Sequence, residues 1–162
     1  MTDQGEISEL SLLKSVPLFA QLTDDELSRT AQFSSRLTLR RDEILIREGD
    51  DAETLFVILR GKLVVLLDNR EIAELQQGEP VGELAFFARG KRTADVVAAR
   101  TSTVLAIERE GYEALARELP MLTQHILESV ADRMSRLTAR SQTLAPRAGR
   151  IIAIEGVGDT LV

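Results

Sequence analysis

The stretch that decides the fold is residues 82–96, GELAFFARGKRTADV. It begins with Gly-Glu, continues through apolar residues, and reaches Arg92 after a loop rich in Arg, Gly and Lys. The apolar residues between the two charges indicate a buried turn. Arg92 carries a planar, permanently charged guanidinium that suits bidentate contact with a phosphate. The stretch therefore predicts an anion site whose carboxylate needs a separate explanation.

That carboxylate belongs to Glu83, whose charge would repel a phosphate. Glu83 fits the site if the ligand also has a hydroxyl near its phosphate, because a carboxylate accepts a hydrogen bond from a ribose 2′-OH in dinucleotide sites. The alternative is a structural salt bridge between Glu83 and Arg92 at the base of a hairpin, with Thr93 as an ordinary strand residue. The spacing leaves both interpretations open.

The backbone around Glu83 adds a second signal for an anion. Gly82 follows Pro80 in a turn and allows a close approach that a side chain would block. The amides of Leu84 and Ala85 come next, and successive free N–H groups after a tight turn can hold an anion. Thr93 would add a hydroxyl beside the guanidinium.

Short strands are expected on both sides of this stretch, because apolar and polar residues alternate there. Turn signals recur every 8–12 residues, which is typical of an all-β barrel or sandwich. The expected strands and turns are a pair within 37–46, a hairpin within 53–67 broken by Gly61, a tight turn at 68–71, and strands at 93–98 and 103–108.

Helical periodicity brackets the strands. Thr23 and Glu26 predict a capping box that begins a helix running to about Ser34. A short helix within 109–119 is stopped by Pro120, and a long helix is expected over 121–144. An apolar seam along the long helix predicts a homodimer, the alternative being that it packs on its own barrel. The seam consists of Leu127, Val130, Met134, Leu137 and Leu144, with Ser141 at the missing position.

Together these features resemble the cyclic nucleotide-binding domain family. Its phosphate-binding cassette reads Gly-Glu-hydrophobic-Ala, then Arg-Thr/Ser/Ala-Ala, and the chain matches over 82–85 and 92–94 with the family's spacing. The resemblance implies a mainly β fold: an antiparallel β-roll, jelly-roll-like (a double-stranded β-helix), with N-terminal helices and a long C-terminal helix. The expected domains are a helical lead at 1–15 and the binding domain at 16–145, with its roll at about 36–109 and its helices at about 110–145. Residues 146–162 read as a linker and an apolar strand, which either closes the domain or begins a following effector domain.

The resemblance also implies a role for each matching residue. Glu83 accepts from the ribose 2′-OH, Arg92 pairs with the cyclic phosphate, and Thr93 touches the phosphate. The amides of Leu84 and Ala85, with Gly82 allowing approach, help to hold sugar and phosphate. Candidates for a lid over the base lie on the long helix: Arg133, Arg136, Leu137 and Thr138. Two positions depart from the family pattern, Lys91 where Pro is common and Val81 where Phe is common.

Composition excludes several other classes. The formal net charge of −6 disfavours nucleic-acid binding by this chain, and the absence of cysteine together with a single histidine leaves no ordinary metal site. Its start lacks a signal peptide, no apolar run is long enough to span a membrane, and a cytoplasmic location is expected.

The function expected is a non-enzymatic sensor. It would bind cAMP or cGMP, without a cofactor, and signal by repositioning its C-terminal helix. The alternatives are a dimerisation module that binds no nucleotide, and the regulatory part of a larger enzyme, transporter or transcription regulator.

Overall fold

The computed structural model describes residues 3–160, with side chains described for 9–140. It divides into two compact units, Met1–Leu127 and Glu128–Val162, and each is considered by itself. The first unit holds two four-stranded sheets in which every pairing is antiparallel. One sheet has the order β1-β8-β3-β6 and the other β2-β7-β4-β5. This confirms the predicted mainly β architecture with flanking helices.

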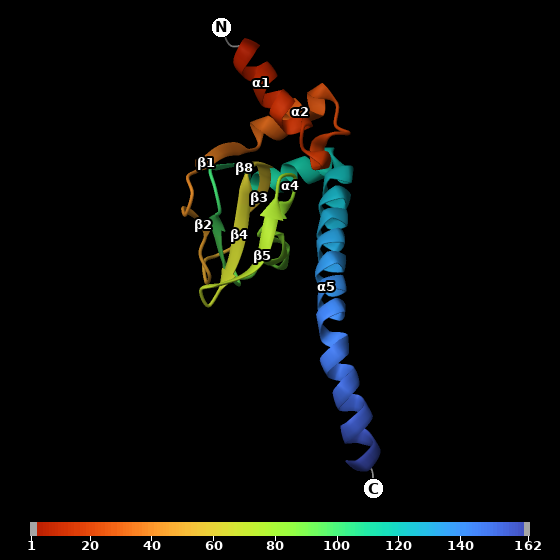
Figure 1. Cartoon of the computed structure of the whole chain (residues 1–162). Helices are drawn as coiled ribbons and strands as arrows, with labels where there is room; N and C mark the ends of the chain where they lie inside the picture. The colour runs from red at the N-terminus through yellow and green to blue at the C-terminus, as the bar shows by residue number, and fades with distance from the viewer. Residues whose placement is uncertain (1–2, 161–162) are drawn as a thin grey trace. The chain divides into compact units, whose positions relative to one another are not determined.

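The strands are β1 (Ser35–Leu39), β2 (Ile44–Ile46), β3 (Thr54–Arg60), β4 (Lys62–Leu67), β5 (Arg70–Gln76), β6 (Pro80–Val81), β7 (Asp95–Ala98) and β8 (Ser102–Glu108). The helices are α1 (Asp3–Lys14), α2 (Asp24–Gln32), α3 (Glu83–Ala88), α4 (Arg109–Glu118) and α5 (Pro120–Thr160), with a 3-10 turn η1 at Pro17–Phe19. Figure 1 shows α1, α2 and α4 gathered at the same end of the two sheets.

The interior of the roll is filled by aliphatic side chains and one phenylalanine, as expected for a chain without tryptophan. Both sheets contribute, because alternate residues of each strand point inward. The buried members are Leu39, Ile46, Phe56, Ile58, Leu63, Leu75, Val81, Val96, Ala98, Val104 and Ala106.

The opposite face of the first sheet changes character along its length. Leu55, Val57, Leu105 and Ile107 alternate with the interior residues and are also buried, so this part of the face is covered. Helix α4 contacts β3 and β8 and supplies part of the cover. Further along β8, Thr103 is half-buried, and its partners on the adjacent strands, Thr38 and Arg60, are exposed. The sheet therefore has an apolar end under helices and a polar end.

The predicted hairpin within 53–67 is wrong. Strand β3 pairs with β6 and β8, whereas β4 pairs with β5 and β7, so Gly61 carries the chain from one sheet to the other. Gly61 has a φ of +103°, and a Cβ there would lie 2.3 Å from the Ser102 Oγ. A two-residue turn is what joins hairpin strands, and a single glycine instead lets the strand bend between sheets.

Two other local predictions are confirmed. A tight turn was expected at 68–71, and the structure has one there: Asp68 and Asn69 both have positive φ and join β4 to β5 as a two-residue hairpin turn. The Thr23 hydroxyl accepts from the Glu26 amide at 3.3 Å, and the Glu26 carboxylate accepts from the Thr23 amide at 2.8 Å. Helix α2 therefore begins with the predicted capping box.

The C-terminal region differs from its prediction. The structure continues α5 through Thr160, so residues 146–160 form helix rather than a linker and a strand. A short apolar run such as 151–154 fits either period, and isolated glycines weaken a helix by only about 1 kcal/mol each. The predicted following domain stays a prediction. None of the described helices is both long enough and apolar enough to cross a membrane.

Candidate functional site

The predicted guanidinium is held deep in the first unit. Arg92 is only 6% exposed and donates from Nη1 to the Gly82 carbonyl at 2.6 Å and from Nη2 to the Thr54 carbonyl. Its Cζ also lies 5.9 Å from the ring centre of Phe56. These two hydrogen bonds use two of the five N–H donors of the guanidinium. Arg92 is therefore fixed in place with donors remaining for a ligand.

Gly82 makes this arrangement possible. It has a φ of +74° and caps α3 from the left-handed region, which glycine adopts without steric cost. A Cβ at this position would lie 2.3 Å from Nη1 of Arg92 and 2.9 Å from Cδ1 of Ile46. Only a residue without a side chain at position 82 lets the Arg92 guanidinium reach the Gly82 carbonyl at the start of α3.

Glu83 follows directly and is buried, at 3% exposed. Burial lowers the pKa of Arg92, and the negative charge of Glu83 acts in the opposite direction to raise it. The two predicted charges are thus brought into one electrostatic environment. Removing a buried charge of either sign would leave the other less compensated.

The remaining predicted residues lie at the start of α3 and beyond Arg92. The sequence analysis expected a turn here, and the structure instead has a six-residue helix beginning at Glu83. Leu84 is 63% exposed, Ala85 is half-buried and Thr93 is exposed. The amides of Leu84 and Ala85 lie in the first turn, where N–H groups have no intrahelical acceptor. The structure therefore brings Gly82, Glu83, Leu84, Ala85 and Arg92 together.

A loop between β2 and β3 fastens the segment around Arg92. The Gly49 amide donates to the Arg92 carbonyl at 2.8 Å, and the Arg92 amide donates to the Asp50 carbonyl at 2.8 Å. Lys91 contacts Asp51 through an exposed ion pair of 2.5 Å. Lys91, the departure from the family's proline, is accommodated by the ion pair.

Sequence reasoning missed Arg109, at the junction of β8 and α4. Its Nη2 donates to the carbonyls of Ala52 at 2.6 Å and Phe86 at 3.0 Å, and its Nε pairs with Glu53 at 3.0 Å. The guanidinium lies 4.3 Å from the Phe86 ring centre. Arg109 thereby joins α3 to the loop before β3 and to the start of α4. A lone arginine after a strand gives no signal of such a role.

Helices α3 and α4 meet in a cluster of three aromatic rings. Phe86, Phe87 and Tyr112 meet pairwise edge to face with ring centres 5.4 Å apart. The Tyr112 hydroxyl contacts the Thr123 hydroxyl at 2.6 Å, which connects α4 to the first turns of α5. Phe86 and Phe87 thus pack against α4. Burial raises the pKa of Tyr112, and the hydrogen bond to Thr123 partly opposes the shift.

The four lid candidates belong to the second unit. Arg133, Arg136, Leu137 and Thr138 lie on α5, where the Thr138 hydroxyl donates to the Met134 carbonyl at 2.9 Å. Their role toward a base stays a prediction.

Comparison with known proteins identifies the fold and the family. A family model described as the cyclic nucleotide-binding domain matches residues 36–118. The crystal structure of the catabolite activator protein of Thermus thermophilus has a TM-score of 0.66 at 28% identity, covering 80% of this chain and 63% of that chain. The N-terminal domain of a transcriptional regulator from Streptomyces coelicolor has a TM-score of 0.57 at 31% identity, covering 77% and 93% of the two chains.

A protein described as an uncharacterized NTE family protein of Mycobacterium tuberculosis is 28% identical over 149 residues, covering 91% of this chain but 25% of its own length. The chain thus spans a quarter of that relative. The family model covers half of the chain and includes both ends of the motif at 82–94. The chain therefore belongs to the cyclic nucleotide-binding domain family.

Proposed function

We propose that this chain is a sensor that binds a cyclic nucleotide, cAMP or cGMP, at the cassette formed by residues 82–93. One observation carries the proposal: Glu83 and Arg92 are both buried, and they lie together at the start of α3. A cyclic nucleotide offers a phosphate to Arg92 and a ribose 2′-OH to Glu83. The same pair explains why a carboxylate lies at an anion site.

The alternative of a purely structural Glu83–Arg92 pair explains less. Arg92 already donates to two backbone carbonyls, which is enough to hold it in place without the carboxylate. Burying a charged pair costs desolvation free energy that its mutual attraction often fails to offset. A ligand that hydrogen-bonds both groups accounts for that cost.

The test is calorimetric titration of cAMP and cGMP into the wild type, Arg92→Ala and the control Arg70→Ala, which removes an exposed arginine from β5. Loss of a charge-assisted phosphate contact should weaken binding by at least about tenfold in Arg92→Ala. Arg70→Ala should bind as the wild type does. Absence of binding to the folded wild type would overturn the proposal.

A second titration avoids the structural role of Arg92. If Glu83 accepts from the ribose 2′-OH, the wild type should bind 2′-deoxy-cAMP roughly tenfold more weakly than cAMP. Glu83→Ala should bind both ligands with similar affinity. Equal affinities of the wild type for the two ligands would remove the assigned role of Glu83.

We further propose that occupancy is transmitted through α3 to α4 and the start of α5. Phe86 and Phe87 contact Tyr112, and Tyr112 contacts Thr123 on α5. A ligand shifts such an equilibrium only by binding one arrangement better than the other. Nucleotide binding should therefore alter amide hydrogen exchange at 120–127 in the wild type, and an unchanged pattern would exclude this route.

Homodimerisation through α5 is also proposed. Within the second unit, Met134 and Leu137 of the predicted seam are 56% and 41% exposed. Exposed apolar residues at helical spacing favour a partner helix. Light scattering should give twice the chain mass, and Met134→Glu should shift it toward one chain mass. A monomeric wild type at high concentration would rule the seam out. The cytoplasmic location and the absence of catalysis stay predictions.

A further inference from the structure

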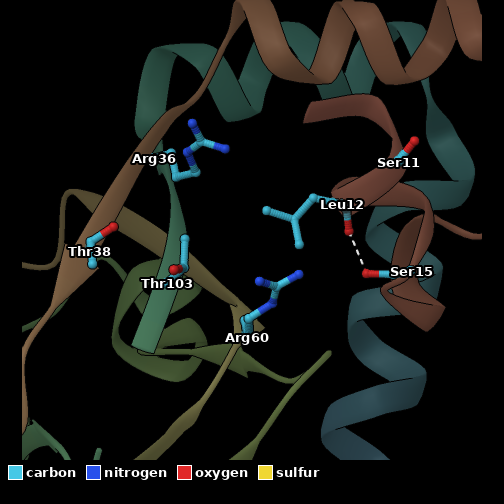
Figure 2. A pocket seen from close by; sticks show the side chains of 7 residues that line it. All are labelled: Ser11, Leu12, Ser15, Arg36, Thr38, Arg60 and Thr103. Atoms are coloured by element: carbon cyan, nitrogen blue, oxygen red, sulfur yellow. Dashed lines mark hydrogen bonds between the residues drawn. The ribbon is translucent and has the colours of Figure 1, made fainter. Parts of the chain in front are cut away.

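A cavity of about 460 Å3 lies between α1 and the polar end of the first sheet, away from the cassette. We call it the α1 cavity and define it by the residues that line it: Ser11, Leu12, Ser15, Arg36, Thr38, Arg60 and Thr103. Figure 2 shows Leu12 pointing from α1 toward the strands, with Arg36 and Arg60 reaching in from the sheet. All seven residues belong to the first unit.

The strand register builds one wall of this cavity. Thr103 on β8 pairs with Thr38 on β1 and with Arg60 on β3, so these three side chains form a row across the sheet. Arg36 lies two residues from Thr38 on the same strand and therefore on the same face. The row stands where the apolar cover of this face ends. The position of both arginines thus follows from the register rather than from flexible loops.

Within the described part of the chain, no acidic side chain pairs with the two arginines of the α1 cavity. Among the described side chains, the guanidinium groups of Arg36 and Arg60 make no hydrogen bond or ion pair, and none of the described lining residues is acidic. Elsewhere Arg29 pairs with Glu118, and Arg89 pairs with Glu113. In a chain of net charge −6, a hollow with two guanidinium groups that no described carboxylate pairs with is a local site of positive potential.

The lining also specifies more than charge. Four hydroxyl side chains surround the hollow, and the Ser15 hydroxyl donates to the Leu12 carbonyl at 2.6 Å, which leaves its oxygen able to accept. Leu12 supplies one apolar contact. The volume lies in the range of small-molecule pockets and exceeds what an inorganic anion fills. An extended polyanion would need a basic face, which the net charge of −6 disfavours.

We propose that the α1 cavity binds a small phosphomonoester of a polyol, such as a sugar phosphate. A phosphomonoester carries nearly two negative charges at neutral pH, which matches the two guanidinium groups. Each planar guanidinium can contact phosphate oxygens through paired N–H groups. The hydroxyl groups of the polyol meet the serine and threonine side chains. This site is independent of the cassette and of its nucleotide.

The test uses glucose 6-phosphate as the probe and amide chemical shifts of the whole chain as the readout. Shifts should gather at α1 and at residues 36–38, 60 and 103, and their saturation gives the affinity. Glucose and inorganic phosphate, each containing half of the ligand chemistry, should bind at least about tenfold more weakly. Binding of inorganic phosphate as tight as that of glucose 6-phosphate would overturn the assigned ligand class.

Three variants locate the site. Arg36→Gln combined with Arg60→Gln should weaken glucose 6-phosphate binding by at least about tenfold, and Thr103→Val should weaken it by a smaller factor. Arg70→Gln, which removes an exposed arginine from the other sheet, should leave binding unchanged. The melting temperature should stay near that of the wild type in the arginine variants, since both side chains are exposed. Unaltered binding in the double variant, or shifts confined to 82–93, would overturn the proposal.

Discussion

An arginine side chain lies at each end of strand β3, and the two have opposite environments. At the Thr54 end, Arg92 is buried and donates to backbone carbonyls. At the other end, Arg60 is exposed near Arg36, and neither guanidinium makes a hydrogen bond to the described residues. The difference separates two uses of one residue type. Arg92 is part of the fold before any ligand arrives, whereas Arg60 can contribute to recognition without contributing to stability.

The strongest way to break this comparison is Gly82→Ala. The left-handed conformation costs a residue with a Cβ about 1–2 kcal/mol, and displacing Arg92 leaves buried donors unpaired. We expect urea unfolding to show a loss of about 3 kcal/mol. Gly90→Ala is the control, because a Cβ there meets nothing within 4 Å. Equal stability of the two variants would show that the fold does not depend on the buried guanidinium.

Arg109→Gln tests whether a second arginine near the cassette is equally structural. The change removes hydrogen bonds to the Ala52 and Phe86 carbonyls and the contact with the Phe86 ring. Urea unfolding should show a loss of about 2 kcal/mol. Arg89→Gln removes only an exposed ion pair to Glu113 and should cost less than about 0.5 kcal/mol. A similar cost in both variants would contradict the contrast between buried and exposed arginines.

Tyr112→Phe should have the smallest effect of the three changes. The loss of the contact with Thr123 should lower the free energy of unfolding by about 1 kcal/mol at neutral pH. Burial raises the pKa of Tyr112, so the folded chain holds the phenol proton to a higher pH than the unfolded chain. The stability that this provides is complete below the unfolded pKa of about 10 and is lost as the pH rises through the folded pKa.

The gap between wild type and Tyr112→Phe should therefore narrow above about pH 10. Because Tyr112 is the single tyrosine and tryptophan is absent, phenolate absorbance reports this residue directly. If the Tyr112 phenol instead titrates at or below the ordinary tyrosine pKa, its hydroxyl is reached by water and is not buried.

Much of the fold could be predicted because local patterns agreed with it. The switch from helical to strand periodicity after Ser34 falls where the strands begin. The capping box at Thr23 and the turn at 68–71 also formed as expected. Gly61 misled because a glycine between two strands does not say which partners the strands will choose. Helix α3 was missed because six residues are fewer than two turns and show no period. The C-terminal apolar run fitted both helix and strand.

The candidate site was predictable to the extent that its residues are close in sequence. Gly82 through Ala85 and Arg92 belong to one motif, and the structure gathers them. Thr54 on β3 and Arg109 at the start of α4 reach the same place from distant parts of the sequence, and only the tertiary structure reveals them. The α1 cavity lay beyond sequence reasoning for the same reason, since its row of side chains depends on register across three strands.

The passage of the chain between sheets at Gly61 has a consequence for how the molecule folds. Among the described strands, β4 and β5 are the consecutive pair that hydrogen-bond to each other, and the other pairings join distant segments, as Ser35 joins Ala106. Closing distant segments is entropically slow, so topologies of this kind fold slowly. We therefore expect the hairpin at Asp68 and Asn69 to form early, and the pairing of β1 with β8, which joins the most distant strands, to close last. The α1 cavity would then appear only at the final step of folding.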